Sequence, residues 1–194
     1  MAFEVELKAH VQDPKVIMAI LEGFEHISEP VCEYKKDIYY AKAKGEDPLF
    51  RLRKESFGPD FDSLTGSILF TYKDKSLKDG IEVNSETEFT TSDAQGENAE
   101  KFFQALGYEI YIEKEKKGYS FVYKPEGFEP LLHIELVQVI GLGWFLEMEF
   151  LLEEQELVHE AKKKLHEVLG MAGLAESDIE SKYYMHMLKE KSAH

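Results

Sequence analysis

Residues 3–10, close to the start of the sequence, alternate apolar and charged side chains. An alternation with a period of two is typical of a β-strand whose two faces differ in polarity. The polar face of this predicted strand carries Glu4, Glu6 and Lys8. At roughly 3.4 Å per residue, two carboxylates and one ammonium group then project to the same side within about 14 Å. Carboxylates bind divalent cations and ammonium groups bind phosphate oxygens, so either chemistry is open to this segment.

Charged residues occupy one face of many further predicted strands, and their signs are mixed. The full set is Glu4, Glu6, Lys8, Arg51, Arg53, Lys73, Glu86, Glu88, Lys114, Lys116, Glu135, Glu147 and Glu149. An open sheet would expose such a face to water, whereas a closed antiparallel barrel would turn it inward. Periodicity alone does not distinguish these two arrangements.

An inward charged face would be costly to desolvate unless ions bind to it. In that arrangement several cations could hold a polyphosphate, while neighbouring carboxylates bind a divalent metal. Carboxylates so close together would otherwise repel one another strongly. The pattern therefore leaves two hypotheses, a solvated sheet surface and a site for a polyphosphate with a metal ion.

The elements that would position these residues are about eight β-strands and several helices. Strands are predicted at residues 3–10, 34–42, 49–55, 67–73, 82–90, 108–116, 119–124, 131–137 and 144–152. Helices are predicted at residues 14–24, 97–106, 153–169 and 177–188, the first with Asp13 as N-cap and Pro14 in its first turn. Residues 56–66 form a polar loop. Because no long linker interrupts the sequence, we expect one α+β domain over residues 1–194.

The composition excludes several classes of protein. The sequence has 38 acidic against 23 basic residues and a net charge of −15, which argues against nucleic acid as a partner. A small anion in a locally basic pocket stays open. The single cysteine, Cys32, cannot form an internal disulfide, which favours a reducing compartment. With no signal-peptide core and no run near the roughly 18 apolar residues of a membrane span, we expect a soluble cytoplasmic protein.

The segment Glu4-Val5-Glu6-Leu7-Lys8 resembles the ExExK signature of the CYTH superfamily, which includes class IV adenylate cyclases, thiamine triphosphatases and inorganic triphosphatases built as triphosphate tunnels. Further motifs follow in the order of that superfamily and extend the resemblance over nearly the whole chain. They are Arg51-Leu52-Arg53, Thr71-Tyr72-Lys73, Glu86-Thr87-Glu88, Ile112-Glu113-Lys114-Glu115-Lys116 with Tyr119, and Gly141-Leu142-Gly143-Trp144-Phe145-Leu146-Glu147-Met148-Glu149. The last motif, the KxK strand and the length are most similar to the class IV cyclase branch.

The resemblance implies a closed antiparallel β-barrel, or tunnel, of about eight strands with flanking helices. It implies that Mg²⁺ or Mn²⁺ is held by Glu4, Glu6, Glu147 and Glu149. It implies triphosphate binding by Lys8, Arg51, Arg53, Lys73, Lys114 and Lys116. The candidate catalytic residues are Lys114 and Glu135. The expected partner is a small-molecule triphosphate, ATP or thiamine triphosphate, with a homodimer left open.

Three activities are compatible with this resemblance. In the cyclase version, metal and Lys114 stabilise charge at the α-phosphorus of ATP while the ribose 3′-hydroxyl attacks and pyrophosphate leaves, which gives cyclic AMP. In the triphosphatase version, water activated by the metal attacks the terminal phosphorus of thiamine triphosphate, a nucleoside triphosphate or tripolyphosphate. The third version is a module that binds a triphosphate without turnover.

Three positions depart from the class IV pattern. Val137 stands where these cyclases usually have Asp, Ser85 stands where Arg is common, and Lys116 replaces an Arg. Glu135 lies two residues before Val137 on the same strand face and is the candidate replacement, although a strand separates the two positions by roughly 7 Å. These departures weaken the case for full cyclase activity and leave triphosphate binding intact.

Overall fold

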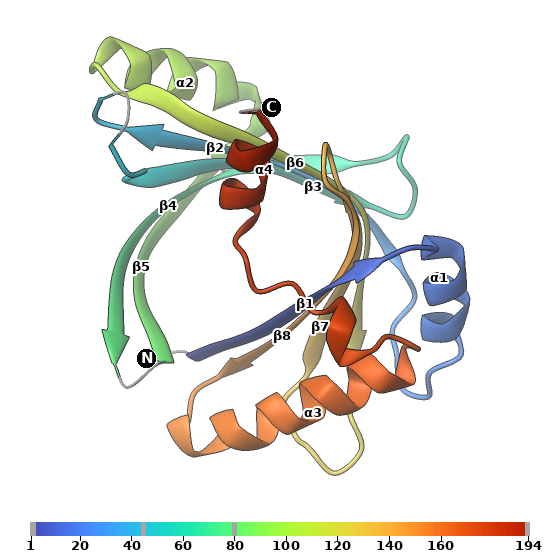
Figure 1. The fold of residues 1–194 in the computed structure, drawn as a ribbon. Helices are drawn as coiled ribbons and strands as arrows, with labels where there is room; N and C mark the ends of the chain where they lie inside the picture. The colour runs from blue at the N-terminus through green and yellow to red at the C-terminus, as the bar shows by residue number, and fades with distance from the viewer. Residues whose placement is uncertain (1–2, 44–45, 79–80, 193–194) are drawn as a thin grey trace. The chain divides into compact units, whose positions relative to one another are not determined.

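The computed structural model describes residues 3–43, 46–78 and 81–192, which contain eight β-strands, four α-helices and three short 3-10 helices (Figure 1). The side chains of residues 3 and 73–86 lie outside this description. The strands form one antiparallel sheet in the order β1-β8-β7-β6-β2-β3-β4-β5. The predicted α+β class with an antiparallel sheet of eight strands is therefore confirmed. No described helix is both long and apolar enough to cross a membrane.

The bounds of the elements follow the sequence pattern closely at most positions. The strands are β1 (Phe3–Val11), β2 (Val31–Ala41), β3 (Phe50–Gly58), β4 (Thr65–Lys78), β5 (Ile81–Ser92), β6 (Glu109–Tyr123), β7 (Leu132–Val139) and β8 (Gly143–Leu152). The α-helices are α1 (Pro14–Glu22), α2 (Gly96–Ala105), α3 (Val158–Met171) and α4 (Tyr184–Ser192). Asp13 caps α1 as predicted, because its carboxylate accepts the backbone N–H groups of Lys15 and Val16.

The chain contains two compact units, of which the first comprises residues 1–32 and 117–194. In this unit the apolar face of β1 lies in the main core, and α3 packs against β1 and β8 (Figure 1). The buried residues of α3 recur at helical spacing and are Val158, Ala161, Leu165, Val168 and Leu169. Because Val5, Leu7 and Ala9 point into this core, the period of two places the charged residues of β1 on the opposite face.

The second unit comprises residues 33–116 and has its own smaller core. Ile38, Tyr40, Leu52, Ile68 and Phe70 form it, and α2 adds partly buried side chains from the outside. Leu52 is fully buried between Arg51 and Arg53, which therefore lie on the other face of β3. The core of this unit thus orients the basic residues in the same way as the core of the first unit orients the acidic ones.

Several predicted elements differ from the structure in their bounds. The helix predicted at 153–169 begins at Val158, and the loop predicted at 56–66 is shortened to residues 59–64 by β3 and β4. The strands predicted at 108–116 and 119–124 join into the single strand β6, and Gly118 lies within it. A Cβ atom at Gly118 would lie 2.1 Å from the carbonyl oxygen of Leu136, so a glycine is needed where β7 approaches.

The helix predicted at 177–188 begins only at Tyr184. Before it, Ile179 forms a β-bridge with Ala9, and the backbone N–H of Glu180 donates to the carbonyl of Lys8 at 2.9 Å. These hydrogen bonds to β1 replace the local helical ones, because a long-range partner satisfies the same backbone groups.

We predict that Gly118→Ala lowers the free energy of unfolding by about 1–3 kcal/mol, because its methyl group would meet backbone atoms of β7. The matched control is Gly170→Ala in α3, where an added Cβ meets no atom within 4 Å. This second substitution should stabilise the protein by about 0.5–1 kcal/mol through helix propensity. Urea denaturation of both variants measures the difference, and an equal effect of the two would contradict the close approach at Gly118.

Candidate functional site

Strands β1, β8 and β7 bring the predicted acidic residues together on one face of the first unit. Lys8 is the cross-strand partner of Glu147, which pairs on its other side with Glu135. Glu6 pairs with Glu149 one row further along. Because directly opposed residues have Cβ atoms roughly 4.5–5.5 Å apart, these rows form one continuous acidic patch that contains a single lysine.

The side chains of this acidic patch are open to solvent to different degrees. Glu4 and Glu6 are exposed, whereas Lys8, Glu135, Glu147 and Glu149 are half-buried. Glu4 lies at the edge of the patch, since its partner on β8 is the apolar Leu151. Glu4 therefore has fewer acidic cross-strand neighbours than Glu147, and the structure supports its predicted role as a metal ligand less strongly.

The acidic patch suits Mg²⁺ or Mn²⁺ by the chemistry of its donors, since these hard cations prefer carboxylate oxygens. Within the described part of the chain, no three His, Cys, Asp or Glu side chains converge closely enough to hold an ion by themselves. Mg²⁺ is usually held by one or two carboxylates together with waters and substrate phosphates, so a preformed cage is not required. The residues thus fit such an ion in type and in register.

Tyr184, the first residue of α4, reaches this acidic patch from the C-terminal segment. Its hydroxyl donates a hydrogen bond to Oε1 of Glu147 at 2.8 Å, and its ring packs edge-on against Phe145. Burial raises the pKa of the Tyr184 hydroxyl, and the negative charges of Glu147, Glu6 and Glu135 raise it further. The hydroxyl is therefore protonated at neutral pH and acts as a donor. The Lys8 ammonium lies 5.3 Å from the centre of the same ring.

Val137 is fully buried, and its cross-strand partner on β8 is Phe145. In this row, one beyond the pair Glu135–Glu147, the residues of β7 and β8 are apolar, and His10 of β1 is the partner of Phe145 on its other side. An acid at Val137 would lie beside Phe145, while Glu135 lies beside Glu147. Glu135, the candidate replacement, therefore lies in a different row from position 137, where the class IV pattern has Asp.

In the second unit, Asp37 of β2 holds two of the predicted phosphate-binding cations. Its carboxylate accepts hydrogen bonds from Nε and Nη2 of Arg53 at 2.6 and 3.0 Å and contacts Nζ of Lys114 at 2.9 Å. Asp37 is fully buried. Burial alone would raise its pKa, but the charges of Lys114 and Arg53, and the hydrogen bonds from Arg53, hold the pKa well below its usual value. Asp37 is therefore ionised throughout the neutral range.

Arg51 is held differently, by a chain of hydrogen bonds across β3, β4 and β5. Its Nη2 donates to the hydroxyl of Thr71 at 3.0 Å, and this hydroxyl donates to Oε1 of Glu88 at 2.7 Å. Nε of Arg51 is buried and has no hydrogen-bond acceptor among the atoms that the structure describes. A buried guanidinium donor without an acceptor is costly unless a ligand supplies one.

The charged face of the second unit carries a surplus of positive charge among its described side chains. Its cationic residues are Lys35, Arg51, Arg53, Lys114 and Lys116, all buried or half-buried, and its fully buried carboxylates are Glu33 and Asp37. Glu55, half-buried on the same face of β3, and Glu88, which is exposed, contribute two further negative charges, so five described cations stand against four described carboxylates. The predicted phosphate ligand Lys73 belongs to β4, but its side chain lies outside the described residues. A locally basic site of this kind attracts anions despite the acidic composition of the chain.

Sequence reasoning missed Asp37, Thr71 and Tyr184 as site residues. A signal for Asp37 is present, because Glu33, Lys35 and Asp37 alternate in the same way as the charged residues of β1. For Thr71 and Tyr184 no local signal exists, since a hydroxyl-bearing residue in a strand or helix is common and the partner of each lies far away in the sequence.

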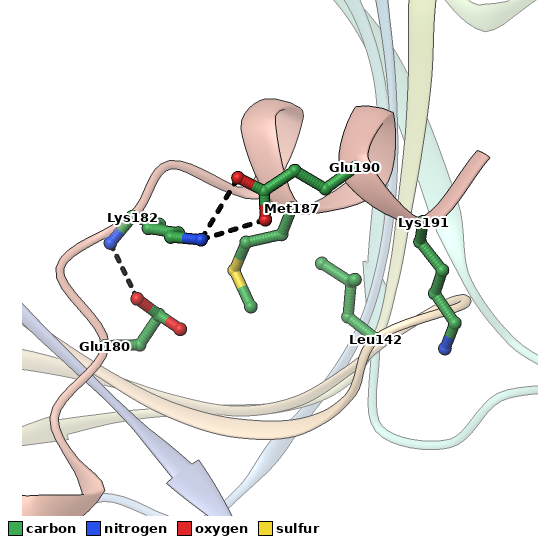
Figure 2. Close-up of a pocket in the computed structure, with 6 residues that line it drawn as sticks. All are labelled: Leu142, Glu180, Lys182, Met187, Glu190 and Lys191. Atoms are coloured by element: carbon green, nitrogen blue, oxygen red, sulfur yellow. Dashed lines mark hydrogen bonds and ion pairs between the residues drawn. The ribbon is translucent and has the colours of Figure 1, made fainter. Parts of the chain in front are cut away.

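A pocket beside α4 in the first unit contains none of the predicted site residues (Figure 2). Its lining residues are Leu142, Glu180, Lys182, Met187, Glu190 and Lys191. Its charges satisfy one another, because Nζ of Lys182 contacts both carboxylate oxygens of Glu190 at 2.9 and 3.0 Å. Lys191 donates to the carbonyl of Gly141. The pocket therefore lacks the charge surplus that marks the second unit.

Comparison with known proteins adds a family and a fold. A family model described as the CYTH domain matches residues 2–184. A protein of Pyrococcus horikoshii OT3 is structurally similar, with a TM-score of 0.71, 23% identity and coverage of 97% of this chain and 99% of that one. A protein of Vibrio parahaemolyticus described as a candidate adenylate cyclase has a TM-score of 0.71 and 20% identity, with 96% and 98% covered.

A further similar structure comes from Hippeastrum, with a TM-score of 0.62, 13% identity and coverage of 98% of this chain and 96% of that one. It is described as a candidate adenylyl cyclase with a dominant triphosphatase activity. A search of curated proteins by sequence found no match. At these identities the structural likenesses show the fold that the proteins share.

We predict that Asp37→Asn lowers the free energy of unfolding by about 3–5 kcal/mol, because it leaves the buried charges of Arg53 and Lys114 without their carboxylate. The pKa of Asp37 is lower in the folded state than the roughly 3.9 of an unfolded chain, so its stabilising contribution is complete above that value and is lost as the pH falls below it. Urea denaturation of the wild type from about pH 5 down to about pH 2, across and below the pKa of an unfolded aspartate, should show this acid-dependent loss. Asp37→Asn should lack this part of the pH dependence.

The matched control is Asp47→Asn, at an exposed aspartate of the same unit. It should change the free energy of unfolding by less than about 0.5 kcal/mol. A similar loss of stability in both variants would show that the buried ion pairs of Asp37 do not stabilise the fold more than an exposed aspartate does.

Proposed function

The chain belongs to the CYTH family, and on that premise we propose that it binds the triphosphate group of a small molecule and cleaves one of its phosphoanhydride bonds with Mg²⁺ or Mn²⁺. The observation that carries the proposal is the excess of cations over carboxylates among the described side chains on the charged face of the second unit, together with Nε of Arg51, which lacks an acceptor among the described atoms. An anion with several charged oxygens would compensate both. The family match extends across both units, which supports the prediction that residues 1–194 form one domain.

The chain's own cations would bind and orient the triphosphate. Arg51 and Arg53 offer planar guanidinium groups suited to bidentate contacts with phosphate oxygens, and the lysines act as more mobile point charges. Asp37 holds Arg53 and Lys114 in place before the ligand arrives. This preorganisation lowers the cost of ordering the side chains on binding. The complete proposed set of triphosphate ligands is Lys8, Arg51, Arg53, Lys73, Lys114 and Lys116.

The acidic patch of the first unit would hold the metal ion. The proposed ligands are Glu6, Glu147 and Glu149, with Glu4 at the edge of the patch. When bound, such an ion neutralises phosphate charge and polarises the phosphoryl group under attack. The chain supplies the carboxylate oxygens and, through Tyr184, a hydrogen bond to one of them.

The bond that is cleaved decides between two enzyme activities. In a class IV adenylate cyclase, the ribose 3′-oxygen attacks the α-phosphorus, the bond to the bridging oxygen breaks, and pyrophosphate leaves. In a triphosphatase, water attacks the terminal phosphorus and orthophosphate is released. In both, Lys114 would stabilise negative charge that develops on the phosphoryl oxygens. The cyclase assignment rests on the similarity of the GLGxFxExE motif to that branch.

One observation favours the triphosphatase as the second candidate. Val137, where the class IV pattern has Asp, is fully buried opposite Phe145 and offers no ligand to a metal or a hydroxyl group. Glu135 is half-buried beside Glu147 and is the nearest acid on that strand face. We assign it the role of accepting a proton from, or orienting, the attacking group. An acid at position 135 in place of 137 would change the position of the attacking oxygen more than it would change triphosphate binding.

We predict that Arg51→Ala weakens the binding of tripolyphosphate at least about 10-fold, because a charge-assisted hydrogen bond contributes about 1.5–3 kcal/mol. Isothermal titration calorimetry with and without Mn²⁺ measures the affinity. The matched control is Lys101→Ala on the outside of α2, where the side chain is 74% exposed and pairs with Glu97. It removes the same charge from the same unit and should leave the affinity unchanged within about 2-fold. Equal weakening by both substitutions would indicate non-specific electrostatic attraction.

The activity itself is tested by product analysis. Purified protein is incubated with Mn²⁺ and, in separate reactions, with ATP, thiamine triphosphate and tripolyphosphate, and the products are resolved by chromatography. Cyclic AMP with pyrophosphate establishes the cyclase, and orthophosphate establishes the triphosphatase. Glu135→Gln should abolish whichever turnover is found while tripolyphosphate still binds. Binding of tripolyphosphate without any product would contradict an enzymatic function and indicate a binding module.

A further inference from the structure

We propose that Tyr184 is a positioning residue for the metal site, and that it acts by fixing the carboxylate of Glu147 through a hydrogen bond from its hydroxyl. The inference rests on the proposed function, in which Glu147 is a metal ligand. It adds a residue from the C-terminal helix α4 to a site otherwise built from strands β1, β7 and β8.

The hydrogen bond from Tyr184 restrains the orientation of the Glu147 carboxylate. The hydroxyl of Tyr184 donates to Oε1 of Glu147 at 2.8 Å, a normal distance for a bond between a hydroxyl and a carboxylate. The terminal torsion of a glutamate side chain is broad, so its own rotamer preference fixes the plane of the carboxylate only weakly. A donor that engages Oε1 fixes this plane and with it the direction of Oε2.

The ring of Tyr184 is held firmly enough to serve as such a donor. It lies in a small buried cluster with Val139 and Phe145, and Leu142 and Met187 pack against this cluster. The ring centres of Tyr184 and Phe145 are 4.9 Å apart in an edge-on arrangement, and Tyr184 is 8% exposed. Because the ring is packed on several sides, the hydroxyl is directed to one place. Packing of the ring in the apolar cluster therefore also restricts the position of the hydroxyl group.

The surroundings of Glu147 explain why it needs a partner of this kind. It lies between Lys8 on β1 and Glu135 on β7, one cationic and one anionic neighbour. Attraction to the first and repulsion from the second would turn the carboxylate toward Lys8 and away from the rest of the acidic patch. A neutral donor restrains the carboxylate without cancelling its charge, so its affinity for a cation is kept. Outer-shell hydrogen bonds of this type contribute about 10–100-fold to metal affinity.

The test is Tyr184→Phe, which removes the hydroxyl and keeps the ring in its apolar cluster. The dissociation constant for Mn²⁺ is measured by electron paramagnetic resonance of the free ion, in the absence of any triphosphate. We expect it to rise about 10-fold in Tyr184→Phe. The matched control is Tyr183→Phe, which removes the hydroxyl of the neighbouring, 47% exposed tyrosine, whose ring lies 5.9 Å from the Lys8 ammonium. It should bind Mn²⁺ like the wild type.

A double-mutant cycle with Glu147→Gln separates positioning from general packing. If Tyr184 acts through Glu147, Glu147→Gln binds Mn²⁺ more weakly than the wild type, and adding Tyr184→Phe causes little further loss. Independent, multiplicative losses would overturn the inference, because Tyr184 would then act by another route. Wild-type Mn²⁺ affinity in Tyr184→Phe would also overturn it, as would equal losses in Tyr183→Phe.

Two further readouts distinguish failure of this inference from failure of the proposed function. Tripolyphosphate binding without metal reports on the proposed phosphate ligands, which are Lys8 and the cations of the second unit. It should be unchanged in Tyr184→Phe, because the ring beside Lys8 is kept, and this also shows that the variant is folded. Wild-type Mn²⁺ affinity in Glu147→Gln would overturn the assignment of Glu147 as a metal ligand and the inference with it. Weak binding in Glu147→Gln together with normal binding in Tyr184→Phe would overturn the inference alone.

Discussion

The buried carboxylate of Asp37 is the interaction on which the basic face of the second unit depends. It joins three strands, because Asp37 lies on β2 while its partners Arg53 and Lys114 lie on β3 and β6. Two cations held near each other without this anion would repel, and each would be costly to bury. The carboxylate removes that repulsion, and the described side chains of the face still include more cations than carboxylates. The second unit can therefore keep a folded, largely buried set of cations before any ligand binds.

The first unit uses a different partner for its acidic residues. Its carboxylates lie in rows across β1, β8 and β7 that also contain Lys8 and His133, and they keep more contact with solvent than the basic residues do. Solvation lowers their mutual repulsion when no metal ion is bound. A buried, neutral tyrosine donates a hydrogen bond to Glu147, and such a donor adds no positive charge to the patch. Each unit thus holds its charged side chains in place without neutralising them.

The faces of the strands could be predicted from the sequence, but the contacts between side chains could not. Side chains alternate between the two faces of a strand, so Glu4, Glu6 and Lys8 lie on one face of β1 independently of the rest of the fold. The burial of Val5 and Leu7 on the opposite face confirms this prediction. The bond from Tyr184 to Glu147 depends instead on where α4 begins, which is set by hydrogen bonds between residues near 180 and β1. The continuous β6 was missed for a similar reason, since Gly118 is explained by the approach of β7 and by no local signal.

The strand register also limits how this chain can compensate for the absence of an acidic residue at position 137. Residue 137 is tied to Phe145 and residue 135 to Glu147, and a strand cannot exchange these rows without shifting all of its buried residues to new partners. An acid at position 135 therefore lies beside the proposed metal ligand, whereas an acid at 137 would lie one row away from it. The cations that would bind the triphosphate belong to other strands and are unaffected by this choice. A substitution at position 137 would therefore change the row that contains Phe145 and leave the row of Lys8, Glu147 and Glu135 in place.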